Sequence, residues 1–173
     1  MVLMSERAID PDSDWELWRR FVRMFRTLDR ALEDDLKRDA GLSQSEFVVL
    51  VTLHDAPERR LRSGRLAELT RWEKSRLSHQ VSRLEQRGLI TREECDDDLR
   101  GTWVTLTADG RRAILRALRP HNASIRERFL VHLSDDEKRA LASLSASVLE
   151  GLGADDGFPA DRPSARPPSR KSA

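Results

Sequence analysis

Apolar residues recur at steps of three and four along the first part of the chain, from about Asp14 to Asp39. The recurring residues are Trp18, Phe21, Phe25, Leu28, Leu32 and Leu36. At about 3.6 residues per turn this spacing places them on one stripe of a helix, and Gly41 is typical of a helix end. The pattern predicts a long amphipathic helix of the kind that often pairs with a partner.

Three shorter helices are predicted in the next segment. The first begins at Ser43, because Ser43 and Glu46 have the spacing of a capping box, in which each side chain bonds the other residue's backbone amide. A short helix follows over Ser63–Thr70. Another is predicted over about 73–87, and Gly88 terminates it.

After Gly88 the apolar period changes from that of a helix to that of a strand. Residues 89–92 and 103–106 are predicted to form two antiparallel strands, and the polar stretch between them suits the tip of a hairpin. The order helix–helix–helix–strand–hairpin–strand over residues 43–106 is the plan of a winged helix.

Two further helices are predicted before the apolar residues run out. Thr107 caps the first, which runs to about Leu130 and which Pro120 is expected to kink or interrupt. A second capping box, Ser134–Glu137, begins the last helix. One face of that helix carries Leu141, Leu144, Val148 and Leu149. From Gly151 onward Gly, Pro, Ser and charged residues dominate, so the tail is predicted to be disordered.

Charge is distributed unevenly along a chain whose formal net charge is only +1. Residues 59–92 hold ten Lys or Arg against three acids, whereas residues 1–40 hold eight against ten. A basic block inside a near-neutral chain indicates a polyanion that faces this block, and a solvated basic surface is the alternative.

The helix over 73–87 has two different faces. At 100° per residue, Leu77, Val81 and Leu84 fall on one narrow arc that would face the core. The opposite arc carries Ser75, Ser78, His79, Ser82 and Gln86, flanked by Arg76 and Arg83. Short polar side chains framed by arginines let a helix enter the major groove of DNA and reach base edges.

The composition argues against a membrane span, a secretory leader and an internal disulfide. No stretch approaches 18 uncharged apolar residues, about the length a span requires. The N-terminus lacks the basic and apolar regions of a leader, and Cys95 is the only cysteine. A reducing cytoplasm is therefore the expected location, and Cys95 is expected to be an ordinary thiol at a strand end rather than a redox sensor.

No arrangement of residues predicts an enzyme, a metal site or a cofactor. The histidines His54, His79, His121 and His132 lack metal-ligand spacing with carboxylates. Asp34 and Asp35 are adjacent on a helix and diverge, so they cannot act as an acid/base pair.

The sequence resembles the MarR family over residues 14–150. The family's wing carries an acid, any residue, an arginine and then a strand that ends in Leu-Thr, which corresponds here to Asp98-Leu99-Arg100 and Leu106-Thr107. The segments RSGRLAELTRWEKSRLSHQVSRLEQRGLI and TADGRR are also similar to the family.

The resemblance implies a mainly α fold with a small β-wing, namely a winged helix-turn-helix domain plus a helical dimerisation region. It implies a homodimer that binds double-stranded DNA. The expected parts are a flexible N-terminus (1–13), an N-terminal dimerisation helix (14–42), a winged helix-turn-helix DNA-binding domain (43–107), C-terminal dimerisation helices (108–150) and a disordered tail (151–173).

Specific DNA contacts are expected from the resemblance and from the helix face. The expected base-reading residues are Ser75, Arg76, Ser78, His79 and Ser82, and the expected phosphate contacts are Lys74, Arg83 and Arg65. Arg100, braced by Asp98, is expected to enter the minor groove. Two-fold symmetry implies a palindromic operator with half-sites roughly 10 bp apart.

The family usually represses transcription and releases DNA when a small phenolic or anionic effector binds between the dimer helices and the winged domain. Candidate lining residues are Trp15, Trp18, Arg19, Phe47 and His54. Two alternatives stay open: a winged-helix scaffold for protein interactions and a chromosomal binder without sequence preference. The polar face of the helix over 73–87 and Arg100 argue against the scaffold, while the basic block supplies affinity for any duplex.

Overall fold

The computed structural model describes residues 11–95 and 98–153 of the chain. The tail predicted to be disordered lies almost wholly outside these residues, as does most of the N-terminus predicted to be flexible. Within the described ranges no helix is long and apolar enough to cross a membrane.

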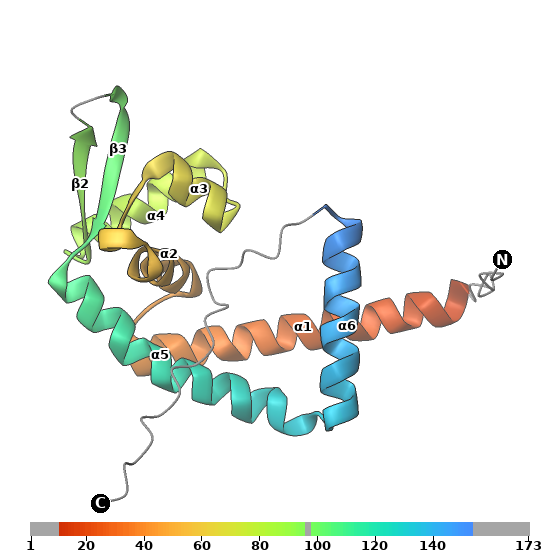
Figure 1. Cartoon of the computed structure of the whole chain (residues 1–173). Coiled ribbons are helices and arrows are strands. Elements are labelled where there is room, and N and C mark those ends of the chain that lie inside the picture. The colour runs from red at the N-terminus through yellow and green to blue at the C-terminus, as the bar shows by residue number, and fades with distance from the viewer. Residues whose placement is uncertain (1–10, 96–97, 154–173) are drawn as a thin grey trace, which may run out of the picture.

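The protein is mostly helical, with one small sheet at the edge of the molecule (Figure 1). The helices are α1 (Pro11–Ala40), α2 (Gln44–Asp55), α3 (Ser63–Thr70), α4 (Lys74–Gln86), α5 (Ala108–Arg128) and α6 (Asp135–Gly151). The strands are β1 (Arg60–Arg62), β2 (Ile90–Cys95) and β3 (Asp98–Leu106), and short 3-10 turns span Pro57–Arg59 and Leu130–His132. This confirms the predicted fold class.

The helix ends follow the capping signals of the sequence. The Ser43 hydroxyl accepts a hydrogen bond from the Glu46 amide while the Glu46 carboxylate accepts one from the Ser43 amide, and Ser134 and Glu137 repeat the arrangement at α6. The Thr107 hydroxyl accepts a hydrogen bond from the Gly110 amide at 3.0 Å. These local bonds satisfy amides that a helix leaves unpaired at its start.

Helix α5 runs through Pro120 without interruption, so of the two expected outcomes, a kink or an interruption, the interruption is wrong and the kink stays a prediction. The residue lacks one backbone donor, but the buried residues on both sides of it keep the helix packed against the rest of the protein. These residues are Ala113, Ile114, Ala117, His121 and Ser124.

The sheet contains a strand that the sequence pattern did not reveal. Its order is β1-β3-β2, and both pairings are antiparallel. Strand β1 has three residues, of which Leu61 alone is apolar, so no alternation marks it. The wing strands also extend farther toward the hairpin tip than the apolar residues indicated, to Cys95 and from Asp98.

One apolar core joins the winged domain to α5 and to the end of α1. It includes Leu36, Leu50, Leu53, Leu66, Leu84, Ile90, Val104 and Ile114, each 2% exposed or less. Gly110 allows α5 to begin against the wing, because a side-chain methyl group there would overlap the Leu89 carbonyl oxygen. The core thereby fixes α4 and the wing relative to α1 and α5, which together with α6 form the helical frame of the protein.

Candidate nucleic-acid interface

Helix α4 presents the two faces that its sequence predicts. Leu77, Val81 and Leu84 are buried in the core. The opposite face is accessible: Ser75, Arg76, Ser78, His79, Arg83 and Gln86 are exposed, and Ser82 is half-buried. The apolar side therefore anchors the helix, and short hydrogen-bonding groups lie on its free side.

The Arg76 side chain is held at the start of α4 by an aromatic ring. Its guanidinium carbon lies 4.4 Å from the centroid of the Trp72 ring, within the range of a cation–π contact. Trp72 belongs to the turn between α3 and α4 and packs partly against the core. The helix pattern of the sequence indicates Arg76 but not this support, which depends on the fold of the turn.

The other predicted phosphate contacts differ in their surroundings. Among the described residues no ion pair involves Lys74 or Arg83, whereas Arg65 pairs with Glu68 at 2.9 Å. Both members of that pair are exposed, so exchanging Glu68 for a phosphate oxygen would cost little. All three cations can therefore meet a phosphate backbone.

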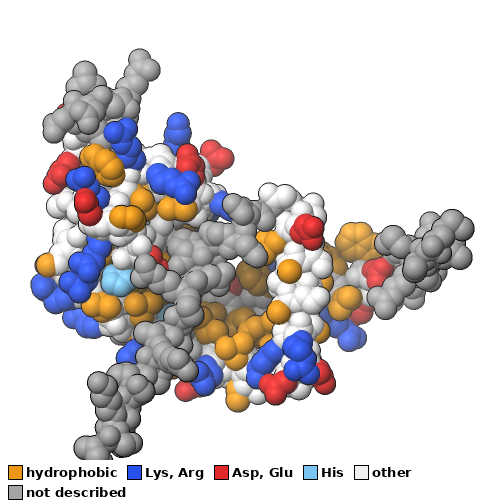
Figure 2. Space-filling view, viewed as in Figure 1, with side chains coloured by type: hydrophobic (Ala, Val, Ile, Leu, Met, Phe, Trp, Pro, Cys, Tyr) orange, Lys and Arg blue, Asp and Glu red, His pale blue; other side chains and the backbone are white. Residues whose placement is uncertain are grey.

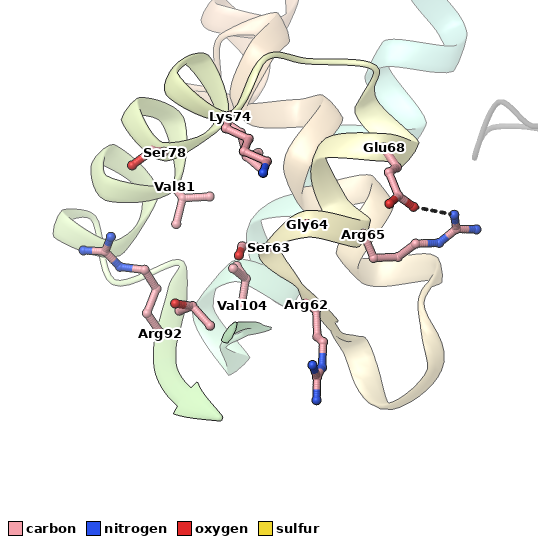
Figure 3. A pocket seen from close by; sticks show the side chains of 12 residues that line it. Arg62, Ser63, Gly64, Arg65, Glu68, Lys74, Ser78, Val81, Arg92 and Val104 are labelled. Carbon is pink, nitrogen blue, oxygen red and sulfur yellow. Dashed lines mark hydrogen bonds and ion pairs between the residues drawn. The ribbon is translucent and has the colours of Figure 1, made fainter. Parts of the chain in front are cut away.

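A hollow of about 610 Å³ separates α4, the start of α3 and the wing (Figure 3). Among the described residues that line it, four are cations, namely Arg62, Arg65, Lys74 and Arg92, and one is an acid, Glu68. Ser78 of α4 and Thr102 of β3 add hydroxyl groups. The hollow is thus a basic, hydrogen-bonding surface suited to a polyanion.

Arg92 on β2 is fixed to α4 through Glu85. Its Nε donates to the Glu85 Oε2 at 2.9 Å. This hydrogen bond lowers the pKa of Glu85, and the same contact raises the pKa of Arg92. The bond links the wing to the helix that carries the polar face.

Two cations of this surface, Arg62 and Arg92, were not singled out by sequence reasoning. Arg62 precedes α3 within the strand that the pattern did not reveal. Arg92 lies opposite the buried Val104 in the register of β2 and β3, and an arginine at an inward position of a predicted strand is the signal that could have identified it.

The end of α4 is braced against the junction of α1 and α2. An Arg87 amino group donates to Glu46 at 2.8 Å, and the other donates to the Gly41 carbonyl oxygen at 3.1 Å. Burial raises the pKa of Glu46, but hydrogen bonds from Ser43 and Arg87 outweigh it and lower the pKa overall. Glu46 therefore stays ionised and serves both the capping box and the brace.

Asp98 and Arg100 lie on β3 at the end of the wing that is distant from the core, and Asp98 pairs with Cys95 in the register. Figure 1 shows this hairpin projecting on the side where α3 and α4 lie. Their side chains fall outside the described part of the structure, so the expected brace between them stays a prediction.

The predicted effector residues are not brought together within one protomer. Trp15, Trp18 and Arg19 are exposed on the first half of α1. Phe47 is buried and its ring lies 4.6 Å from that of His121. His54 borders a separate surface hollow at the end of α2. The assignment of an effector pocket stays a prediction.

The described residues contain no group of three or more His, Cys, Asp or Glu that could hold a metal ion. Asp34 is exposed, and Asp35 is buried in a salt bridge with Arg128. The two carboxylates therefore occupy different surroundings.

The chain is similar to known transcriptional regulators. A family model described as MarR family matches residues 42–102. A MarR family transcriptional regulator from Streptomyces coelicolor, solved in complex with DNA, is 33% identical, with 83% of this chain and 92% of that chain covered and a TM-score of 0.77. The transcriptional regulator HosA of Escherichia coli is 33% identical over 62% of this chain and 78% of HosA.

A further solved structure shares the fold at lower identity. It is an organohalide-sensing transcriptional regulator in a 2,4-dichlorophenol-bound form, 19% identical, with 87% of this chain and 89% of that chain covered and a TM-score of 0.72. The residues that the family model matches, 42–102, include helix α4, strand β2 and the first part of β3. By its sequence and its fold, this chain belongs to the MarR family of transcriptional regulators.

Proposed function

We propose that this regulator is a repressor that binds a palindromic operator as a homodimer and that a small effector releases it. The observation that carries the proposal is the exposed polar face of α4 beside a hollow lined by four cations. A helix that served only as a scaffold would have no need of short hydroxyl groups framed by arginines on this face.

In the proposed complex α4 enters the major groove. The short side chains of Ser75, Ser78 and Ser82, with His79, let α4 lie deep enough in the groove for them to reach base edges, and Arg76 can read guanine from its position over Trp72. Lys74, Arg83 and Arg65 bind phosphates, which set the register of the helix on the duplex. Arg100, braced by Asp98, enters the neighbouring minor groove, whose negative potential attracts a guanidinium.

The second protomer is proposed to cover the apolar side chains of the frame. Trp18 and Phe25 of α1 and Leu144 and Val148 of α6 are each more than half exposed in the single chain. Figure 2 shows such side chains over α6 and along α1, while Lys and Arg side chains gather over the winged domain. We assign residues 14–42 and 108–150 to dimerisation and residues 43–107 to DNA binding.

The effector is proposed to be a phenolic or anionic molecule bound where the frame meets the winged domain. A regulator of the same fold has been solved with 2,4-dichlorophenol, which supports the chemical class. The candidate residues remain Trp15, Trp18, Arg19, Phe47 and His54. Those on α1 would line the pocket of the partner protomer. A rotation of the winged domain relative to the dimerisation helices would change the spacing of the two α4 helices in the dimer.

Selection of binding sites from a random duplex pool, followed by titration across a salt series, tests the proposal. We expect a two-fold symmetric consensus that outcompetes unrelated DNA at physiological salt. The double variant Ser78→Ala/His79→Ala serves as the comparison. It should lose the preference for the bases that α4 contacts but keep its affinity for unrelated DNA. Binding without a consensus would replace the proposal by a chromosomal binder, and absence of binding at low salt would favour a scaffold.

A further inference from the structure

The outer face of the sheet carries two arginines beside one tryptophan. Arg62 lies opposite Trp103 in the register of β1 and β3, and Leu61 lies opposite Val104. Successive side chains of a strand point to opposite faces. Since Val104 is fully buried and Leu61 packs on the core, Arg60, Arg62 and Trp103 lie on the face turned away from the core.

Both guanidinium groups are positioned over the Trp103 ring. Their central carbons lie 4.5 Å (Arg60) and 5.4 Å (Arg62) from its centroid. Such a contact restricts a long side chain without occupying the N–H groups at the edge of the guanidinium. A pair of arginines that is already ordered loses less conformational entropy when it binds an anion.

This cluster continues the surface that faces DNA in the proposed complex. Arg62 and Arg65 line the hollow beside α4 and also a second hollow of about 390 Å³ that Arg60 and Trp103 line. In Figure 3 Arg62 extends outward from the start of α3, away from α4. The basic surface thus turns from the hollow onto the outer face of the sheet.

Acidic residues near the cluster are exposed and can exchange for phosphate. Glu58 lies 3.1 Å from the Arg60 Nε and is largely exposed, and Glu93 on β2 lies opposite Trp103 and is exposed. Exposed ion pairs contribute little free energy. The Glu58 carboxylate therefore does not prevent an anion from binding Arg60.

We propose that Arg60 and Arg62, positioned by Trp103, bind backbone phosphates of duplex DNA outside the half-site that α4 contacts. The inference rests on the proposed function and extends it, because it assigns a second, sequence-independent contact to each protomer. It implies that the protein needs DNA on both flanks of the operator for full affinity.

The test compares the unmodified protein with the double variant Arg60→Gln/Arg62→Gln on two duplexes carrying the selected site, one ending at the half-sites and one extended by a full turn on each side. On the long duplex the slope of log affinity against log salt should fall by about 0.9 for each arginine lost per bound protomer. On the short duplex the loss of slope should be smaller, at most that of Arg62, because Arg62 also lines the hollow beside α4.

Three controls make the result decisive. Arg139→Gln removes an exposed charge from the side of α6 turned away from Leu144 and Val148 and should leave the slope and the length dependence unchanged. Arg60→Lys/Arg62→Lys keeps the charge and should keep most of the slope. Thermal unfolding checks that each variant folds, and the variants remain measurable because both arginines lie on the surface.

Equal slopes for the double variant and the unmodified protein on long DNA would overturn the inference, as would an equal loss on both duplexes. If no consensus emerges from site selection, the same slopes are measured on a long random duplex. A smaller slope for the double variant there would retain the phosphate contact while the proposed operator function fails, and absence of any duplex binding would overturn both.

Discussion

Large apolar side chains are buried in the winged domain of this protein but exposed along α6 and the first half of α1. Leu50, Leu66 and Leu84 of the winged domain are completely buried within one chain. In the frame, Trp18 is 54% exposed and Leu144 is 57% exposed, and no residue of α6 is buried. Exposed apolar patches of this kind mark interaction sites, so the comparison separates a domain whose apolar residues are covered within one chain from helices whose outer faces leave apolar residues open to a second surface.

The largest expected effect on stability comes from the winged domain. Leu84→Ala should lower the free energy of unfolding by about 2–5 kcal/mol, because it leaves a cavity in a fully buried site. Denaturant unfolding at a protein concentration well above dimer dissociation measures it. Ser78→Ala, on the exposed face of the same helix, should change stability by less than about 0.5 kcal/mol; equal losses would contradict the assignment of the two faces.

Substitutions on the exposed apolar face of the helical frame should weaken dimerisation rather than lower the stability of the single chain. Leu144→Glu places a charge in the proposed dimer interface and should weaken dimerisation by about 100-fold, which corresponds to about 2.8 kcal/mol. Sedimentation velocity over a dilution series measures it. Ala146→Glu, on the other side of α6, is the control, and a variant at Leu144 that stays dimeric would remove α6 from the interface.

One buried ion pair joins α1 to α5 within the frame. Asp35 is 3% exposed and accepts hydrogen bonds from Arg128 and Arg38, each with a contact of 2.7 Å. Because both arginines are partly exposed, Asp35→Asn should cost about 1–3 kcal/mol of unfolding free energy, less than the loss of one partner from a fully buried pair. Urea unfolding at neutral pH measures it, with Asp34→Asn as the exposed control.

The same pair predicts how stability depends on pH. The hydrogen bond from Arg128, with smaller contributions from Arg38 and Ser124, holds the pKa of Asp35 well below its usual value. Its contribution is therefore complete above the unfolded pKa of about 3.9 and is lost as the pH falls below it. The difference between the unmodified protein and Asp35→Asn should shrink between about pH 5 and pH 2, and a constant difference would contradict this origin.

The smallest expected effect is confined to DNA binding by the winged domain. Arg100→Ala should weaken operator affinity about tenfold and relax the preference for flanking A·T pairs, without changing the dimer or its stability. Anisotropy titrations on operators with altered flanks measure it. Unchanged affinity on every flank would remove the wing arginine from recognition.

Local signals in the sequence predicted much of this molecule. The faces of α4 followed from spacing alone, and the capping boxes at Ser43 and Ser134 located two helix starts because their hydrogen bonds join residues three apart. Signals of this kind need no knowledge of the rest of the fold.

Contacts between distant residues were beyond such reasoning. Asp35 and Arg128 are 93 residues apart and Arg87 and Glu46 are 41 apart, and no local pattern links them. The stacking of arginines on Trp103 likewise depends on β1, whose three residues carry one apolar side chain. The polar face of α4 could therefore be predicted from the sequence. The contacts that position the surrounding arginines, from Glu85, Trp72 and Trp103, could not.

The central claim, that two protomers hold two α4 helices at a fixed spacing on a palindrome, is tested most directly by changing the distance between half-sites. Inserting five base pairs at the centre of the selected operator rotates one half-site by about half a turn. A fixed dimer predicts that affinity then falls nearly to that for unrelated DNA. Affinity that is unchanged by the insertion would show that each protomer binds independently and would contradict the account.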